Sequence, residues 1–558
     1  MKYYIFFSFL ILLISCKKNK IETKKSNVIP RYVWHDQDES AAIEKTQELK
    51  NSRMHLKLIN AKGRDKNDIW NDLMGDIMKL STERIKEISP FIIEQNIPAI
   101  QGSIKNGRLS YEELVLFYLD RIVRFESDPE KELNAVISLN PEAINQARKL
   151  DKEGKDVDVY SLYGMPILLK DNIGSIGMKT TAGAIALKDN ITTDAFITKR
   201  LKEEKAIILG KANLSEWAYY LCSGCPVGYS AVGGQTINPY GRLKFESGGS
   251  SSGSGASIAA NYAIAAIGTE TSGSILSPSS QNNLVGLKPT IGLFSRSGIV
   301  PISSHLDTPG PMTKNVIDNA IISEALKGKD SKDPYSYEVS NNFVASVKNK
   351  SLENVRIGYI NSYLSDTLYT KTIDKLKQTK AKLIEVDMKS VPMPGFLSIL
   401  NKDMELDLVN YYKDYVVDTI PNRSIKELVA FNESDSTKYV PYGQQLFKGI
   451  LKDTTSATSL IKIKNDLMEV SRGYFDAAFQ TNSKNNQLDV LLSINNYDAG
   501  YAAVAHYPAL TIPMGLSTEG EPKNITLITL SKKEEVLYKI GGSIEDKLQA
   551  RKLPLGYE

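Results

Sequence analysis

Histidine and cysteine are scarce in this sequence, which has four His and three Cys among 558 residues. The only closely spaced cysteines are Cys222 and Cys225 in LCSGCPVG, and a zinc site would need two further ligands that no second C-x-x-C pair supplies. We therefore expect no metal site and no cofactor. The pair fits a local disulfide or two small loop residues, and we assign it no catalytic role.

A charge imbalance is also missing. The 69 basic and 65 acidic residues leave a net charge of +4, without a concentrated basic stretch in the folded part. The electrostatic signature of nucleic-acid binding is therefore absent, and we expect no nucleic-acid partner. With 42% hydrophobic and 24% charged residues, the composition is that of a soluble globular enzyme. The length fits one large domain or about two to four ordinary ones.

The apolar run near the N-terminus is too short to cross a membrane, since residues 5–14 make up only ten positions. The run follows Lys2 and ends in LISC at residues 13–16, which resembles the lipobox of bacterial lipoproteins. We expect a lipoprotein signal peptide over residues 1–15 and lipidation at Cys16. The protein would then be an exported bacterial lipoprotein, anchored to a membrane through its lipid and facing the periplasm or the cell surface. The alternative is an ordinary signal peptide in which the cysteine is incidental.

The rest of the chain is expected to fall into two parts. Residues 16–75 are rich in Lys, Asn, Asp and Glu, and we expect them to hold the lipidated cysteine, a tether and an accessory region. Residues 76–558 are expected to form the main domain. Within it, Ser110 and Glu113 have the spacing of a capping box, which predicts the start of a helix.

Short apolar runs without alternation, such as residues 167–169 and 206–209, are typical of strands buried on both faces. They alternate with helical stretches such as the alanine-rich residues 256–266. This order predicts an α/β fold with a mixed central sheet. Residues 360–485 are mostly helical in pattern, and we expect them to cover the substrate side.

Residues 247–255 read SGGSSSGSG, and three interpretations compete. A flexible linker would separate domains, but this stretch runs directly into a predicted buried helix and strand. A phosphate-binding loop would need G-x-x-x-x-G-K-[ST] or G-x-G-x-x-G, and neither pattern is complete. Residues 249–253 match the nucleophile elbow G-x-S-x-G around Ser251. The elbow also needs a buried strand before it and a catalytic histidine after it, and the sequence shows neither in a recognisable context.

A serine nucleophile in a chain so poor in histidine needs another base. Lys170 is the candidate, because it ends the apolar run GMPILLKDN and a buried, hydrogen-bonded lysine can be neutral. Taken alone, a lysine in this place is more typical of a solvated strand end.

Three blocks in this order resemble the amidase signature family: GMPILLKDN at 164–172, the long block from GGSSSGSG to GLKPT at 248–290, and DTPGPM at 307–312. The resemblance covers about residues 80–545 and includes YPALTIPMG at 507–515. It implies the amidase signature fold, an α/β fold with a mixed, twisted central β-sheet covered on both faces by helices. It also implies hydrolysis of a linear amide, a carbon–nitrogen bond other than a peptide bond.

The resemblance further implies a Ser–cis-Ser–Lys triad. Carried over by motif, Ser274 is the nucleophile and Lys170 the base. Ser250, which lies 24 residues before Ser274 and follows a cis peptide bond from Gly249, is the bridging serine. Protons would pass from Ser274 through Ser250 to the lysine, and an acyl-enzyme would form and be hydrolysed. Glycine before the bridging serine removes the Cβ that would hinder a cis bond.

Backbone N–H groups are implied as the oxyanion hole, from Thr271, Ser272, Gly273 and Ser274. Ser251 and Thr269 match positions that hydrogen-bond within the same network.

The commonest family form is GTDxGGSIR, whereas this chain has GTETSGSIL, with Glu270, Ser272 and Leu276 as the departures. The variant resembles the branch that contains bacterial peptide amidase, so we expect a small-molecule or peptide amide as substrate. The alternatives are a fatty or aryl amide hydrolase and a binding lipoprotein without turnover. A protein that amidates charged tRNA also belongs to the family, and the predicted export argues against it.

Overall fold

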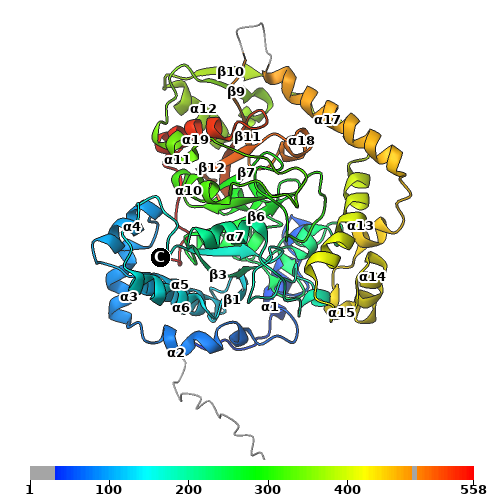
Figure 1. The fold of residues 1–558 in the computed structure, drawn as a ribbon. Coiled ribbons are helices and arrows are strands. Elements are labelled where there is room, and N and C mark those ends of the chain that lie inside the picture. Colours follow the sequence, from blue (N-terminus) through cyan, green and yellow to red (C-terminus); the bar gives the residue numbers. More distant parts are fainter. Residues whose placement is uncertain (1–31, 480–486) are drawn as a thin grey trace, which may run out of the picture.

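An eleven-stranded mixed β-sheet forms the centre of the computed structural model, which describes residues 32–479 and 487–558 (Figure 1). The order of its strands is β1-β3-β2-β6-β8-β7-β12-β13-β11-β9-β10, and β4 and β5 form a separate pair. The strands are β1 Val136–Leu139, β2 Pro166–Lys170, β3 Ile207–Ala212, β4 Tyr229–Ser230, β5 Gly234–Gln235, β6 Ala265–Glu270, β7 Val285–Lys288, β8 Thr308–Thr313, β9 Arg356–Ile360, β10 Lys382–Val386, β11 Val490–Ile494, β12 Ala509–Leu516 and β13 Pro522–Ile528.

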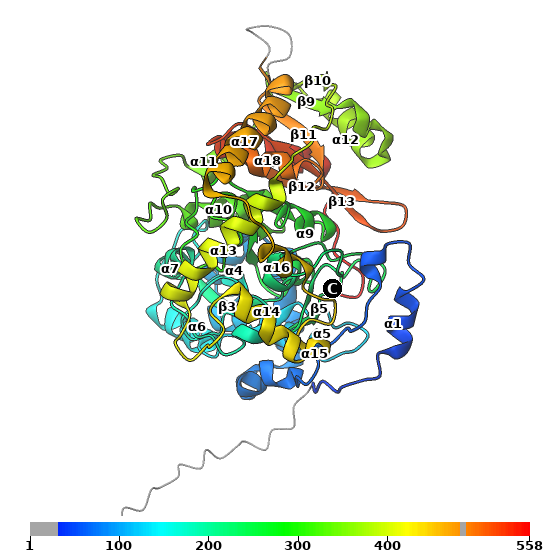
Figure 2. The same cartoon turned by 90° about the vertical axis from the view of Figure 1, so that its right-hand side faces the viewer.

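Helices cover both faces of this sheet, as the sequence predicts, and α13 to α17 form a group beside it (Figures 1 and 2). The helices are α1 Ser40–Thr46, α2 Met74–Ile77, α3 Thr82–Ile88, α4 Ile97–Lys105, α5 Tyr111–Glu126, α6 Ala143–Glu153, α7 Phe196–Glu203, α8 Ser252–Ala259, α9 Leu276–Gln281, α10 Val316–Leu326, α11 Phe343–Lys348, α12 Thr367–Lys377, α13 Phe396–Tyr415, α14 Ile425–Ser434, α15 Ser436–Tyr439, α16 Gln445–Ile450, α17 Ala457–Phe479, α18 Ala499–Ala505 and α19 Glu534–Leu548. Of the predicted helical region at 360–485, the described residues 360–479 are mostly helical and also contain β10.

The apolar runs predicted as buried strands are β2 and β3, and every residue of both is buried. The strand β2 lies between β3 and β6 and is parallel to both, whereas β6 and β8 pair antiparallel. The sheet is therefore mixed, and β2 and β6 end at the same edge. The predicted capping box is present at the start of α5, where Ser110 accepts from the N–H of Glu113 and Glu113 accepts from that of Ser110.

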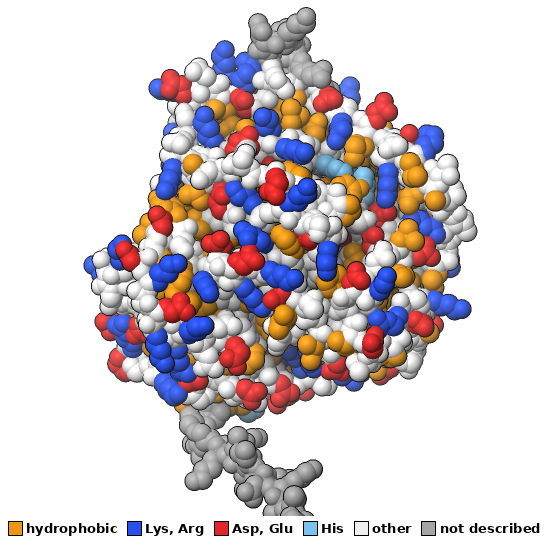
Figure 3. All heavy atoms as spheres, in the orientation of Figure 1, with side chains coloured by type: hydrophobic (Ala, Val, Ile, Leu, Met, Phe, Trp, Pro, Cys, Tyr) orange, Lys and Arg blue, Asp and Glu red, His pale blue; other side chains and the backbone are white. Residues whose placement is uncertain are grey.

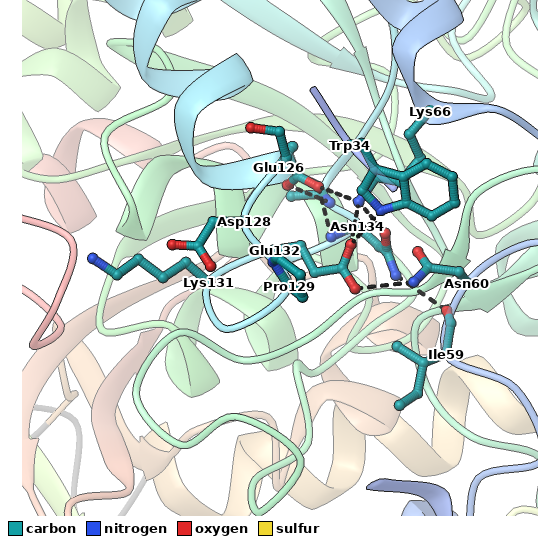
Figure 4. A network of polar contacts seen from close by, with 12 residues as sticks. Trp34, Ile59, Asn60, Lys66, Glu126, Asp128, Pro129, Lys131, Glu132 and Asn134 are labelled. Atoms are coloured by element: carbon teal, nitrogen blue, oxygen red, sulfur yellow. Dashed lines mark hydrogen bonds and ion pairs between the residues drawn. The ribbon is translucent and has the colours of Figure 1, made fainter. Parts of the chain in front are cut away.

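Side chains from residues 32–75 join the main domain through a buried ion-pair network (Figure 4). Lys66 Nζ donates to Glu126 at 3.1 Å, to Glu132 at 2.8 Å and to Asn134 at 2.8 Å. Trp34 donates from its indole nitrogen to the same Glu132 carboxylate at 3.1 Å. The part of the predicted accessory region that the structure describes is thus anchored by charge-assisted hydrogen bonds.

Replacing Lys66 with Ala is expected to lower the free energy of unfolding by about 3–5 kcal/mol, because two buried carboxylates lose their cation. Guanidinium chloride denaturation measures this change. Lys62→Ala, at an exposed lysine four residues earlier, is the matched control and should stay close to wild type. Equal stability of the two variants would contradict the anchoring role.

On the face shown in Figure 3, Lys and Arg side chains are interspersed with Asp and Glu. This pattern agrees with the absence of a concentrated basic stretch in the sequence.

Candidate active site

Lys170 lies at the carboxyl end of β2, and its side chain is completely buried. Its Nζ donates to the Ser250 hydroxyl at 2.8 Å, to the Thr269 hydroxyl at 2.8 Å and to the Thr269 carbonyl oxygen at 3.1 Å. Asn172 donates to the same Thr269 hydroxyl at 2.9 Å. The interpretation of Lys170 as a solvated strand end is therefore wrong: the apolar strand ends in a buried amine surrounded by hydroxyl groups.

Burial lowers the pKa of Lys170 to about 7, because the charged ammonium loses its hydration. The carboxylates of Asp307 and Glu270 act in the opposite direction and raise it. With a pKa near 7, a large fraction of the molecules carries the neutral amine at neutral pH, as a general base requires.

The serine- and glycine-rich residues 247–255 form a turn and the first part of α8. The peptide bond between Gly249 and Ser250 is cis, as the resemblance implies. A Cβ atom on Gly253 would overlap backbone atoms of Asn213. The small side chains of this stretch therefore follow from the close approach of a neighbouring backbone.

Ser251 joins this turn to the end of β6. Its hydroxyl donates to the Thr269 carbonyl oxygen at 3.0 Å and accepts from the Thr269 N–H at 3.2 Å. Because this buried hydroxyl is held by one backbone residue on both sides, the G-x-S-x-G pattern around it marks a structural contact.

Glu270 orders the loop between β6 and α9. Its carboxylate accepts from the N–H groups of Gly273 at 2.7 Å, Ile275 at 2.7 Å and Leu276 at 3.0 Å. Burial raises the pKa of this carboxyl group, while the three N–H donors and the cation of Lys288 lower it. The sequence identified Glu270 only as a departure from the usual Asp, and this role was missed.

Ser274 lies in the same loop and is half-buried, whereas Ser250 is completely buried. The carbonyl oxygen of Ser274 accepts from the Ser251 N–H at 3.2 Å. Within residues 32–479 and 487–558 its hydroxyl makes no hydrogen bond. The structure thus brings Lys170, Ser250 and Thr269 together through side chains and joins Ser274 to them through the backbone.

Residues 271–274, which we call the oxyanion loop after the role that the resemblance implies for them, present backbone N–H groups of two kinds. The N–H of Gly273 is directed to Glu270. Those of Thr271, Ser272 and Ser274 make no hydrogen bond within the part of the chain that the structure describes.

Two further polar residues of the site were missed. Asn172 donates to Thr269, and the Thr271 hydroxyl donates to Asp307 at 2.6 Å. Asn172 and Asp307 lie inside motifs that the sequence shows, GMPILLKDN and DTPGPM, but only the three-dimensional contacts assign them to the site.

Within residues 32–479 and 487–558, no His or Cys side chain hydrogen-bonds to Lys170, Ser250 or Thr269. Cys222 and Cys225 form a disulfide, which is one of the two possibilities left open by the sequence. His305 and His506 contact each other, with ring centroids 4.9 Å apart.

The family model described as Amidase matches residues 113–538, more than half of the chain. A probable amidase of Arabidopsis thaliana is 33% identical over 499 residues, which cover 85% of this chain and 94% of the relative. A relative from Schizosaccharomyces pombe, also named as an amidase, is 32% identical over 514 residues, which cover 83% and 87%.

Solved structures give the same result. An amidase family protein from Bacillus anthracis has a TM-score of 0.83 and 34% identity, covering 89% of this chain and 99% of that one. Peptide amidase from Stenotrophomonas maltophilia has a TM-score of 0.75 and 33% identity, covering 83% and 98%. A glutamyl-tRNA(Gln) amidotransferase chain from Thermotoga maritima has a TM-score of 0.60 and 25% identity, covering 83% and 97%.

This fold and these matches define the class of the protein, which is an α/β enzyme that hydrolyses amide bonds. The chain belongs to the amidase family, with the signature motifs and the signature fold expected from the sequence.

The predicted localisation as an exported bacterial lipoprotein is wrong. Relatives named as amidases from a plant and a fission yeast match 85% and 83% of the chain, and neither is a bacterial protein. The prediction depended on residues 1–16, a short pattern with little information beside a match of this length, and these residues lie outside the described ones.

Among residues 32–479 and 487–558, no helix is both long and apolar enough to cross a membrane. With the predicted localisation withdrawn, export no longer counts against a role like that of the glutamyl-tRNA(Gln) amidotransferase relatives.

Proposed function

We propose that this amidase hydrolyses C-terminal carboxamides of peptides through a triad of Ser274, Ser250 and Lys170. The observation that carries the proposal is the 2.8 Å hydrogen bond between Lys170 and Ser250 inside a fully buried group of hydroxyls. The position of the buried amine supports turnover, because its neutral form, which burial favours, lies within hydrogen-bond distance of the Ser250 hydroxyl and can accept its proton.

In this mechanism neutral Lys170 takes a proton from Ser250, which takes one from Ser274. The Ser274 oxygen attacks the carboxamide carbon, and the relay returns the proton to the leaving nitrogen as the C–N bond breaks and ammonia departs. Water, deprotonated through the same relay, attacks the acyl ester, releases the carboxylic acid and restores the serine.

The oxyanion of the tetrahedral intermediate would bind at the oxyanion loop. The free N–H groups of Thr271, Ser272 and Ser274 support this assignment. Gly273, assigned to the same hole by the resemblance, has φ +87°, a backbone conformation that glycine adopts without strain and that turns the loop. In this assignment the N–H of Gly273 is shared between the Glu270 carboxylate and the oxyanion.

The rate is expected to rise with pH through about 7, the pKa of Lys170, because the ammonium form cannot accept a proton. The sign follows from the cause: burial lowers this pKa, so the active neutral form gains population above it. A profile of kcat/KM from about pH 5 to 9 measures the acid limb. A profile that is flat, or highest at the acid end, would contradict Lys170 as the base.

The similarity to peptide amidase supports a peptide substrate. Both the TM-score and the sequence identity are higher for peptide amidase than for the glutamyl-tRNA(Gln) amidotransferase chain. A screen for ammonia or amine release from amidated peptides, fatty amides and aryl amides tests it, with Ser250→Ala as the matched inactive variant. Amidated peptides should be the best substrates of the wild type. A preference for fatty or aryl amides would overturn the substrate class, and no hydrolysis of any amide would overturn the proposed function.

A further inference from the structure

We propose that Asp307 is a positioning residue of this site, which fixes the start of the oxyanion loop through Thr271 and acts through its charge on Lys170. The inference rests on the proposed function, since both roles serve the chemistry at Ser274. Asp307 opens the DTPGPM stretch, and no step of the proposed mechanism uses it.

The carboxylate of Asp307 joins two segments. Oδ1 accepts from the Thr271 hydroxyl at 2.6 Å. Oδ2 accepts from the N–H groups of Ile302 at 2.8 Å and Ser303 at 2.9 Å. With one oxygen bound to each segment, the side chain sets the distance between the oxyanion loop and the 302–303 turn.

The backbone shows why this contact is needed. The strands β6 and β8 pair as far as Glu270 and Thr308, so Thr271 is the first residue that the sheet no longer holds. Glu270 accepts from the N–H groups of Gly273, Ile275 and Leu276, and the N–H of Thr271 makes no hydrogen bond within the described residues. The bond from the Thr271 side chain to Asp307 therefore restrains the one end of the loop that Glu270 does not reach.

Asp307 also acts over a distance on the base. Its negative charge raises the pKa of Lys170 against the larger effect of burial, and Glu270 acts in the same direction. Arg296 donates to the Asp307 carbonyl oxygen at 3.1 Å, but its cation is paired with Asp333 at 2.5 Å. The other titratable groups around the 302–307 turn are His305, with Tyr335 and His506 against it, and, from α13 and α17, Asp403, Asp407 and Lys464.

The two roles can be separated by the sign of their effects. Burial raises the pKa of Asp307 to about 6, so most of its charge is present near pH 7, where Lys170 titrates. Asp307→Asn removes the charge and should move that limb to lower pH. Thr271→Val removes the hydroxyl but keeps the carboxyl group, so the limb should move less than in Asp307→Asn.

The experiment compares kcat/KM against pH for the wild type, Asp307→Asn, Thr271→Val and the double variant. Both single variants should lower the plateau by about tenfold, the cost of a lost charge-assisted hydrogen bond. The double variant should lose less activity than the product of the two single losses, because both substitutions remove the same hydrogen bond. Asp318→Asn is the matched control: Asp318 is a buried carboxylate whose pKa is also raised to about 6, but it binds the N–H of Ile97 on α4.

An Asp307→Asn profile with an unmoved acid limb, or with a wild-type plateau, overturns the inference, and so does an equal shift in Asp318→Asn. These results require an active wild type. A wild type that hydrolyses no amide defeats the proposed function instead, and the two failures are therefore distinguishable.

Discussion

Ser274→Ala is expected to lower kcat on the best amide substrate by on the order of 10⁶-fold, as removal of a serine nucleophile does in a hydrolase whose residues act as a unit. Without the Ser274 oxygen no acyl-enzyme forms, and the free N–H groups of the oxyanion loop can stabilise only a much slower attack by water. Ammonia release under saturating substrate measures the change.

Ser254→Ala is the matched control for this variant. Ser254 lies in the serine-rich stretch, is buried, and has a hydroxyl without a hydrogen-bond partner in the described part of the chain. Its loss should leave kcat within a few-fold of wild type. Comparable losses in both variants would show that serine content, and not the position of Ser274, matters.

Lys170→Met is expected to lower kcat/KM by about 10²- to 10⁴-fold at neutral pH, the usual contribution of a general base. Methionine keeps most of the volume of the buried side chain, so the fold should be retained, as circular dichroism can verify. The deficit should shrink as the pH rises, because hydroxide can replace the missing base. Measurements at pH 7 and at high pH give the comparison.

Lys314→Met controls for the loss of a buried lysine as such. Lys314 is also buried, with a pKa lowered to about 8 mainly by burial, and it donates to Asn261 at 2.8 Å. Activity that survives in Lys170→Met but falls in Lys314→Met would contradict the assignment of the base.

The features that the sequence predicted without the resemblance are those with local signals. The capping box at Ser110 depends on residues three apart, and Lys170 ends a continuous apolar run, so both could be read from short stretches. The cis bond at Gly249 and the roles of Ser250 and Ser274 came from the resemblance, because no local pattern distinguishes Ser274 from its many neighbouring serines.

The contacts that the sequence missed are long-range. Lys66 meets carboxylates that follow it by 60 and 66 residues, and Thr271 meets Asp307 across 36 residues. No periodicity encodes such pairs, since they depend on which strands become neighbours. The wrong localisation has the opposite cause: a short terminal pattern outweighed the information in the whole chain.

The most direct test of the central claim is to treat the protein with a fluorophosphonate and to locate the adduct by peptide mass spectrometry. A fluorophosphonate reacts with an activated serine and leaves a covalent mark on its oxygen. The account predicts a single adduct on Ser274, formed faster as the pH rises through about 7 and absent in Ser274→Ala. An adduct on Ser251, at the centre of the G-x-S-x-G pattern, or labelling that persists in Ser274→Ala, would contradict it.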